Sequence, residues 1–148
     1  MSQALGENDW YDWEDDTRRG ARNQFRWSLQ ALACEPDDQL ALFPDFVCKP
    51  YELVSDYDHW SNVARSFFAG LFSDDQLTAL QAIDVRIDTM SRGGTDFEET
   101  LWNEDAMATR SEWEELRSLS KSALASFDWP TEKPPWGRSL YARRPDSA

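Results

Sequence analysis

Residues 73–128 decide the fold, and they read SDDQLTALQAIDVRIDTMSRGG (73–94), TDFEETLWNEDAMATR (95–110) and SEWEELRSLSKSALASFD (111–128). The first and third pieces carry apolar residues at the three- and four-residue steps of an amphipathic helix. The second piece is acidic and contains a tryptophan. We therefore predict two core helices joined by an acidic, tryptophan-bearing connection.

Both predicted helices begin with a capping signal. Ser73 precedes Gln76, and Ser111 precedes Glu114, at the spacing of a capping box. The buried faces are predicted to consist of Leu77, Leu80, Ile83, Ile87 and Met90 in the first helix and of Trp113, Leu116, Leu119, Ala123 and Phe127 in the second. The pair Gly93-Gly94 predicts the end of the first helix.

Two further helices are predicted upstream. Over residues 17–34, Phe25, Leu29 and Leu32 fall on one helical face. Over residues 50–72, apolar residues recur at alternating steps of four and three: Leu53, Tyr57, Trp60, Ala64, Phe67 and Leu71. Short apolar runs bounded by prolines predict a buried connection over 37–50.

Four long helices, short connections and no alternating strand pattern predict an all-α, single-domain helical bundle. The bundle is expected over residues 17–130, between an irregular acidic arm (1–16) and a tail with prolines and arginines (131–148). The arm contains the cluster Trp10-Tyr11-Asp12-Trp13. These aromatic side chains are expected to dock either on the protein's own body or on a partner.

The charge is strongly negative and uneven along the chain. The formal net charge is −13, and residues 35–105 hold sixteen acids against four bases. Nucleic acids and anionic membranes would repel such a chain, whereas a basic protein would be attracted. A stripe of Arg18, Arg22 and Arg26 is better explained by pairing with the protein's own carboxylates than by phosphate binding. We therefore predict a basic protein partner, with no direct nucleic-acid contact and no membrane contact.

The start of the chain lacks the basic and apolar regions of a secretory signal, and no run approaches the roughly 18 apolar residues that span a bilayer. A cytoplasmic protein is the expectation. In that compartment Cys34 and Cys48 are predicted to be buried thiols and not a disulfide. With His59 as the single histidine, they cannot assemble a zinc site of four nitrogen and sulfur ligands. No metal or other cofactor is predicted.

The motifs of the common enzyme classes are missing. The sequence has no GxxxxGK[ST], GxGxxG or GxSxG. The run Asp56-Tyr57-Asp58-His59 is similar to the opening of a calcium loop, but it lacks the later glycine and glutamate and falls inside a predicted helix. A triad of Cys34, His59 and an aspartate has no local support. We therefore predict no catalytic residue; the alternative is an enzyme with an unrecognised carboxylate or cysteine site.

The segment from Leu77 to Phe127, ending in Trp113…Leu116-Arg117…Ala123-Leu124…Phe127, resembles small acidic helical bacterial proteins. These include immunity proteins, which neutralise toxins by binding them. The resemblance covers about a third of the chain, lies in general texture and not in a motif, and transfers no functional residue. It implies a non-catalytic inhibitor.

The leading hypothesis is an immunity-type inhibitor whose acidic face, with an exposed Trp102, covers the basic site of a nuclease-like toxin. The predicted partner-binding residues are Asp84, Asp88, Asp96, Glu98, Glu99, Trp102, Glu104 and Asp105. The oligomeric state is left open.

One alternative is a phage-type nucleic-acid mimic that blocks a DNA- or RNA-binding defence protein. A globule of this length spans about 38 Å, a length of DNA that carries about 22 phosphates. Mimicry therefore requires the carboxylates to gather on one face. A further alternative is a structural or adaptor domain whose acidity only keeps it in solution.

Overall fold

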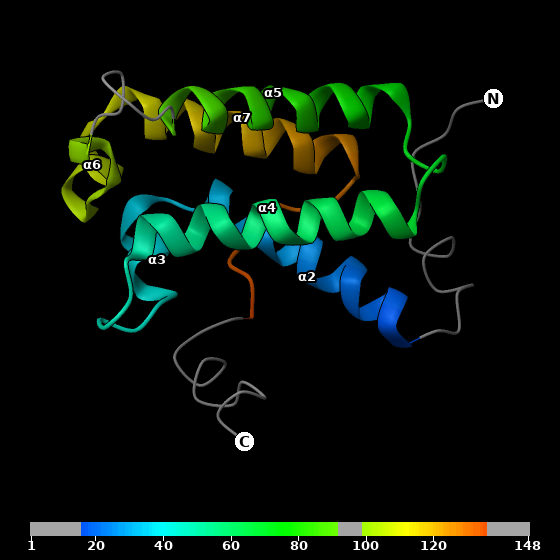
Figure 1. The fold of residues 1–148 in the computed structure, drawn as a ribbon, viewed down its shortest axis with the longest axis horizontal. Coiled ribbons are helices and arrows are strands. Elements are labelled where there is room, and N and C mark those ends of the chain that lie inside the picture. The colour runs from blue at the N-terminus through cyan, green and yellow to red at the C-terminus, as the bar shows by residue number, and fades with distance from the viewer. Residues whose placement is uncertain (1–15, 92–98, 136–148) are drawn as a thin grey trace.

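The computed structural model describes residues 16–91 and 99–135, with side chains from residue 19 onward. This part of the chain is all-α and contains no strand, which confirms the predicted fold class (Figure 1). Its elements are α2 (Asp16–Ala33), α3 (Pro36–Ala41), α4 (Lys49–Phe67), α5 (Asp74–Met90), the 3₁₀ turn η2 (Glu99–Trp102), α6 (Glu104–Thr109) and α7 (Ser111–Ser126). None of the helices in these ranges is both long and apolar enough to cross a membrane.

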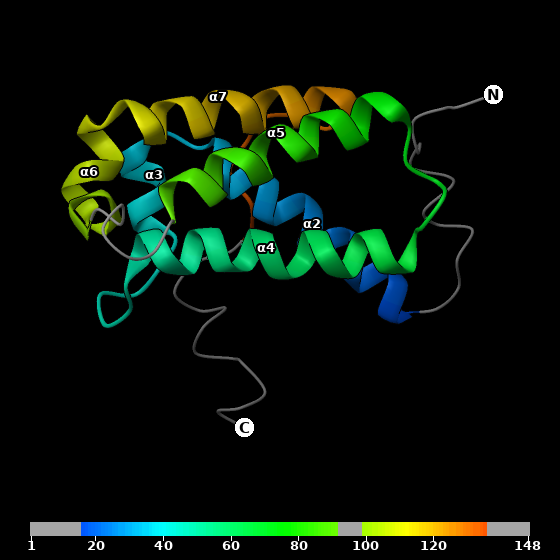
Figure 2. The ribbon, with the colours of Figure 1, turned by 45° about the horizontal axis from the view of Figure 1, so that its top comes forward.

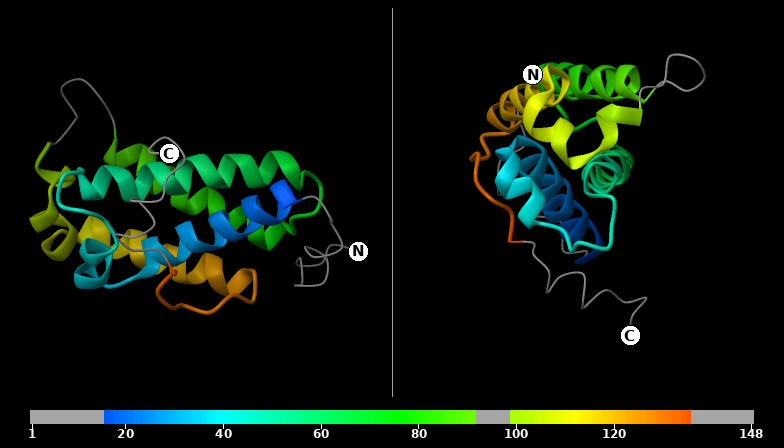
Figure 3. Two further views of the ribbon diagram at one scale, coloured as in Figure 1. Left: turned by 90° about the horizontal axis from the view of Figure 1, so that it is seen from below. Right: turned by 90° about the vertical axis from the view of Figure 1, so that its left-hand side faces the viewer.

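The four long helices surround one core. Helix α5 packs against α7, α7 against α2, and α2 against α4. Helices α4 and α5, although consecutive in the sequence, approach each other less closely than these three pairs. Figure 2 shows α5 crossing between α4 and α7, and Figure 3 shows the four helices around their common interior. The short helices α3 and α6 lie at one end of the bundle (Figure 1).

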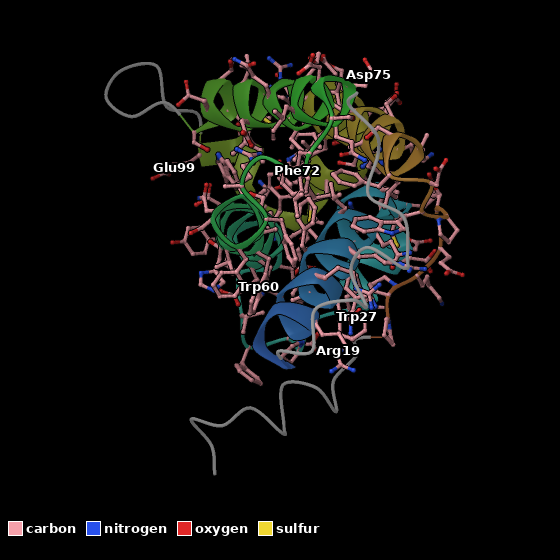
Figure 4. The ribbon with its side chains drawn as sticks, turned by 90° about the vertical axis from the view of Figure 1, so that its right-hand side faces the viewer. Arg19, Trp27, Trp60, Phe72, Asp75 and Glu99 are labelled. Carbon is pink, nitrogen blue, oxygen red and sulfur yellow. The ribbon has the colours of Figure 1, made fainter. Side chains whose placement is uncertain are left out.

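An aromatic cluster fills the core near the end of α7. Phe25 lies 5.5 Å from Phe127 in an edge-to-face arrangement, and Phe72 lies 5.6 Å from Phe127. Trp129 stacks on Phe127 at 4.6 Å. Edge-to-face and offset rings add about 0.5–1.5 kcal/mol per pair beyond the area they bury. Figure 4 shows Phe72 directed between the helices, whereas Asp75 lies at the outer edge. The cluster therefore joins α2, the α4–α5 connection and the segment after α7.

Helix α2 buries the predicted face, since Phe25, Leu29 and Leu32 are fully buried. Two arginines of the predicted stripe, Arg22 and Arg26, contact other parts of the chain. Arg22 is only 2% exposed, and Arg26 lies 4.0 Å from Glu132 and above the Trp129 ring. The pairing of Arg26 with a carboxylate of its own chain is confirmed.

Helix α4 is shorter than predicted and ends at Phe67 instead of Phe72. The connection that follows includes Gly70 at φ +83°, a conformation that a side chain disfavours. Helical periodicity is lost from that point. Phe68 and Phe72 are therefore buried, and Leu71, which was predicted to lie on the buried stripe, is exposed.

Helix α5 begins with the predicted capping box. The Gln76 backbone N–H donates to Ser73 Oγ at 3.1 Å, and the Ser73 N–H donates to Gln76 Oε1 at 2.9 Å. The Gln76 amide also donates to the Ser126 carbonyl at 3.2 Å, so this polar side chain is fully buried. Its inward position turns Leu77 outward. The prediction of a buried Leu77 is wrong, whereas Leu80 is fully buried as expected.

The connection before α7 is helical in part, and this moves the start of α7. Arg110 ends α6 and also serves as the N-cap of α7, with extended backbone angles. Ser111 is already the first helical residue, and no side-chain cap is formed there. The capping box predicted at Ser111 and Glu114 is therefore wrong.

The proline-bounded stretch after α2 contains a short helix. Gln39 of α3 is fully buried, and its amide donates to the carbonyls of Ala31 and Leu32 at the end of α2. Both cysteines are free thiols, and Cys34 is buried as predicted. Cys48 is exposed just before α4, so its predicted burial is wrong.

Candidate functional site

Two adjoining hollows lie between α4 and α5, which approach each other less closely than the three packed pairs. The larger, of about 570 Å³, is lined by Arg65, Leu77, Gln81, Asp84, Val85 and Asp88. The second, of about 420 Å³, is lined by Tyr51, Val54, Ser55, Asp58, Asn62, Asp84, Ile87, Asp88 and Ser91. Because Asp84 and Asp88 line both, the two hollows form one groove, the α4–α5 groove.

Exposed apolar side chains are concentrated in this groove. Val85 is 57% exposed, Tyr51 60% and Leu77 44%. They are three of the five large hydrophobic side chains that are exposed in the described ranges. Single exposed hydrophobic residues are ordinary, but a group of them beside a hollow is typical of an interaction surface.

Carboxylates without an ion-pair partner accompany these apolar groups. Asp58 of α4 and Asp88 of α5 are exposed, and neither forms an ion pair with a described residue. The single basic residue of the lining is Arg65, which is already paired with Asp84 at 2.8 Å. The groove therefore offers two uncompensated negative charges next to apolar surface.

A polar cluster of Tyr57, Arg65 and Asp84 lies at the groove, where Arg65 and Asp84 belong to the lining and Tyr57 is fully buried behind them. The Tyr57 hydroxyl donates to Asp84 Oδ1 at 3.0 Å and accepts from Arg65 Nη2 at 3.3 Å. Burial, followed by the charge of Asp84, raises the pKa of Tyr57 well above its usual value, so the hydroxyl keeps its proton. Burial alone would lower the pKa of Arg65, but the hydrogen bond to Asp84 and the neighbouring charges raise it overall. The cluster joins α4 to α5 through two hydrogen bonds and one ion pair.

The structure divides the predicted site residues into groups. Asp84 and Asp88 lie in the α4–α5 groove, although Asp84 is neutralised by Arg65. Asp96 and Glu98 lie outside the described residues. Glu99, Glu104 and Asp105 are exposed on η2 and α6, and none of them lines the groove.

Trp102 differs from the expected exposed anchor. Its indole N–H donates to the Met90 carbonyl at 2.9 Å, and the partly buried ring meets the buried Trp113 edge to face at 5.6 Å. The Trp113 indole in turn donates to the Leu101 carbonyl at 2.7 Å. Trp102 therefore attaches the acidic connection to α5 and α7.

Tyr51, Asp58 and Val85 are among the groove residues that were not predicted to bind a partner. Asp58 was interpreted only as part of a solvated helix surface. Val85 carried a usable signal, because it is an apolar residue of α5 that lies between Asp84 and Arg86 in the sequence and does not belong to the predicted buried stripe.

Cys34 and His59, the two residues considered for a nucleophilic triad, differ in their surroundings. Cys34 is buried, and burial together with the charge of Asp38 raises the pKa of its thiol to about 11, the opposite of an activated nucleophile. His59 is exposed and meets Trp60 edge to face at 4.6 Å. Within the described ranges, no three histidine, cysteine or acidic side chains are grouped as metal ligands. Comparisons with protein-family models, curated proteins and solved structures found no match.

Proposed function

We propose that this chain is a non-catalytic protein-binding inhibitor of the immunity type, which neutralises a basic, nuclease-like toxin through its acidic surface. The observation that carries the proposal is the excess of carboxylates over basic side chains. The ranges 35–91 and 99–105 hold fourteen acids against three bases, a balance of −11. Three of the four acids of α5, and the acids of η2 and α6, form no ion pair with a described residue.

The distribution of the bases supports the same function. Arg22 of α2 is buried and Arg26 lies beside Glu132, so neither arginine is available to neutralise the carboxylates of α5, η2 and α6. Carboxylates without partners accelerate the encounter with a basic protein, and nearby apolar side chains slow its dissociation.

The test is affinity capture from the source cell with the full chain as bait, followed by an activity assay on the purified captured protein. We expect a basic protein that binds with sub-micromolar affinity, loses activity at a 1:1 ratio, and binds at a rate that falls as salt rises from about 50 to 500 mM. Failure to capture a basic protein would contradict the proposal, as would an affinity unaffected by salt. If duplex DNA displaces the chain from the captured protein, and the captured protein loses no catalytic activity on binding, the nucleic-acid-mimic alternative would be favoured.

A further inference from the structure

We propose that the α4–α5 groove is the docking site for a basic amphipathic helix of the partner protein. This inference rests on the proposed function and narrows it. It places the principal contact between α4 and α5, away from the acidic η2 and α6. Three observations carry it: the shape of the groove, its apolar walls and its uncompensated charge.

The length of the groove fits one helix. On α4 the lining runs from Tyr51 to Arg65, and on α5 it runs in the opposite direction from Leu77 to Ser91. Each wall covers fourteen residue steps, or about 21 Å at 1.5 Å per residue. An occupant helix of roughly fourteen residues, about four turns, would fill it.

The walls specify the chemistry of the occupant. Tyr51, Leu77 and Val85 are exposed and require apolar side chains opposite them. Asp58 of α4 and Asp88 of α5 line the same hollow and have no ion-pair partner among the described residues. A helix with a central apolar stripe and lysine or arginine on both sides of it would satisfy both features.

The charge of the groove also disfavours a second copy of this chain as the occupant. Each copy carries a formal charge of −13 and would present Asp58 and Asp88 to an equally negative surface. Like charges placed opposite each other across an interface repel and disfavour the complex. A basic partner meets no such repulsion.

The fixed cluster behind the groove prepares the site for binding. Arg65 and Asp84 neutralise each other, and Tyr57 holds both in place. The groove therefore needs no rearrangement of these three groups when a helix docks, which limits the entropic cost of binding.

The test uses the full chain and a defined probe, a 16-residue peptide of lysine, leucine and alanine with its leucines on one helical face. Fluorescence anisotropy measures its affinity, and backbone amide shifts locate it. The double variant Asp58→Lys/Asp88→Lys is expected to weaken binding at least tenfold, with shifts confined to α4 and α5. The matched control Asp37→Lys/Glu114→Lys makes the same charge change at exposed positions outside the groove and is expected to change binding less than threefold.

A second part of the test removes exposed apolar side chains from the groove. The double variant Leu77→Ser/Val85→Ser leaves the net charge unchanged. Because both side chains are exposed, the variant is expected to keep its fold, and a thermal melt checks this. It is expected to weaken binding at least fivefold. A peptide of the same composition with the leucines scattered around the helix is expected to bind at least tenfold more weakly.

Four outcomes would overturn the inference. Equal loss in both charge-reversal variants would mean diffuse electrostatic attraction, which leaves the proposed function standing without this site. Amide shifts centred on η2 and α6 would place the contact there. Peptide binding that appears only after removal of residues 136–148 would make the chain's own end the occupant, and self-association through α5 at micromolar concentration would make it a second copy.

Discussion

The two cysteines show how strongly a residue's surroundings decide its chemistry. Cys34 is buried after α2, and burial raises the pKa of its thiol to about 11. Cys48 is exposed, and its Sγ lies 3.9 Å from the Trp102 carbonyl. Thiol reactions require both the thiolate form and access to the reagent. Cys34 lacks both.

We therefore expect an aromatic disulfide reagent at pH 7.5 to modify one thiol per native chain quickly, and this thiol is Cys48. Modification of Cys34 requires opening of the fold and should be slower by more than about 100-fold, because core opening costs several kcal/mol. Absorbance of the released thiolate measures both phases. Cys48→Ser removes the fast phase, and a fast phase that persists in this variant would contradict the assignment.

The start of a helix depends on a whole element and not on a two-residue motif. Ser73–Gln76 and Ser111–Glu114 have the same sequence spacing, but only the first forms a capping box. The residues before Ser73 form a non-helical connection. The residues before Ser111 form α6. The last hydrogen bond of α6 runs from the Arg110 N–H to the Ala106 carbonyl at 2.8 Å, and it makes Arg110 the boundary between α6 and α7. The preceding helix therefore decides where α7 begins.

Two alanine substitutions test this difference. Ser73→Ala removes a side-chain acceptor from the start of α5 and is expected to lower the free energy of unfolding by about 1 kcal/mol. Ser111→Ala removes no cap and is expected to change it by less than about 0.5 kcal/mol. Urea denaturation monitored by circular dichroism compares them, and equal losses would show that Ser111 also caps its helix.

The sequence was sufficient to predict the four long helices, because their apolar periodicity extends over three or more turns. It was insufficient where a polar side chain competes for the core. Gln76 can be buried because its side-chain amide forms hydrogen bonds with the Ser73 N–H and the Ser126 carbonyl. Ser126 belongs to α7 and is distant from Gln76 in the sequence. The exposure of Leu77 follows from that long-range contact, so local periodicity could not predict it.

At the scale of the molecule, the bundle is closed by polar side chains and not by helix packing on one of its sides. Helices α5, α7, α2 and α4 pack in that spatial order, and the remaining side, between α4 and α5, is bridged by Tyr57, Arg65 and Asp84. The candidate groove lies on this side. It could not be predicted from the sequence because it depends on the separation of two helices. Two of its lining residues, Asp84 and Asp88, were nevertheless predicted from charge.

Removal of one hydroxyl tests the bridge. Tyr57→Phe leaves the ring in place but removes the hydrogen bonds that the hydroxyl forms with Asp84 and with Arg65. We expect the free energy of unfolding to fall by about 1 kcal/mol. The value stays modest because both charged side chains are partly exposed and can bind water instead. Tyr51→Phe, at an exposed tyrosine of the same helix, is the matched control with an expected change below about 0.5 kcal/mol. Equal stabilities for the two variants would contradict the bridge.

The spatial order of the helices has a consequence for synthesis on the ribosome. Helix α2 is made first, yet one of its two closely packed neighbours is α7, the last helix to emerge. At about 5–20 residues per second, translation from the end of α2 to the end of α7 takes roughly 5–20 s. During that time the nascent chain contains Phe25 but does not yet contain Phe127 and Trp129, whose rings contact Phe25 in the folded protein. The nascent chain therefore completes its core only when the last helix has left the exit tunnel.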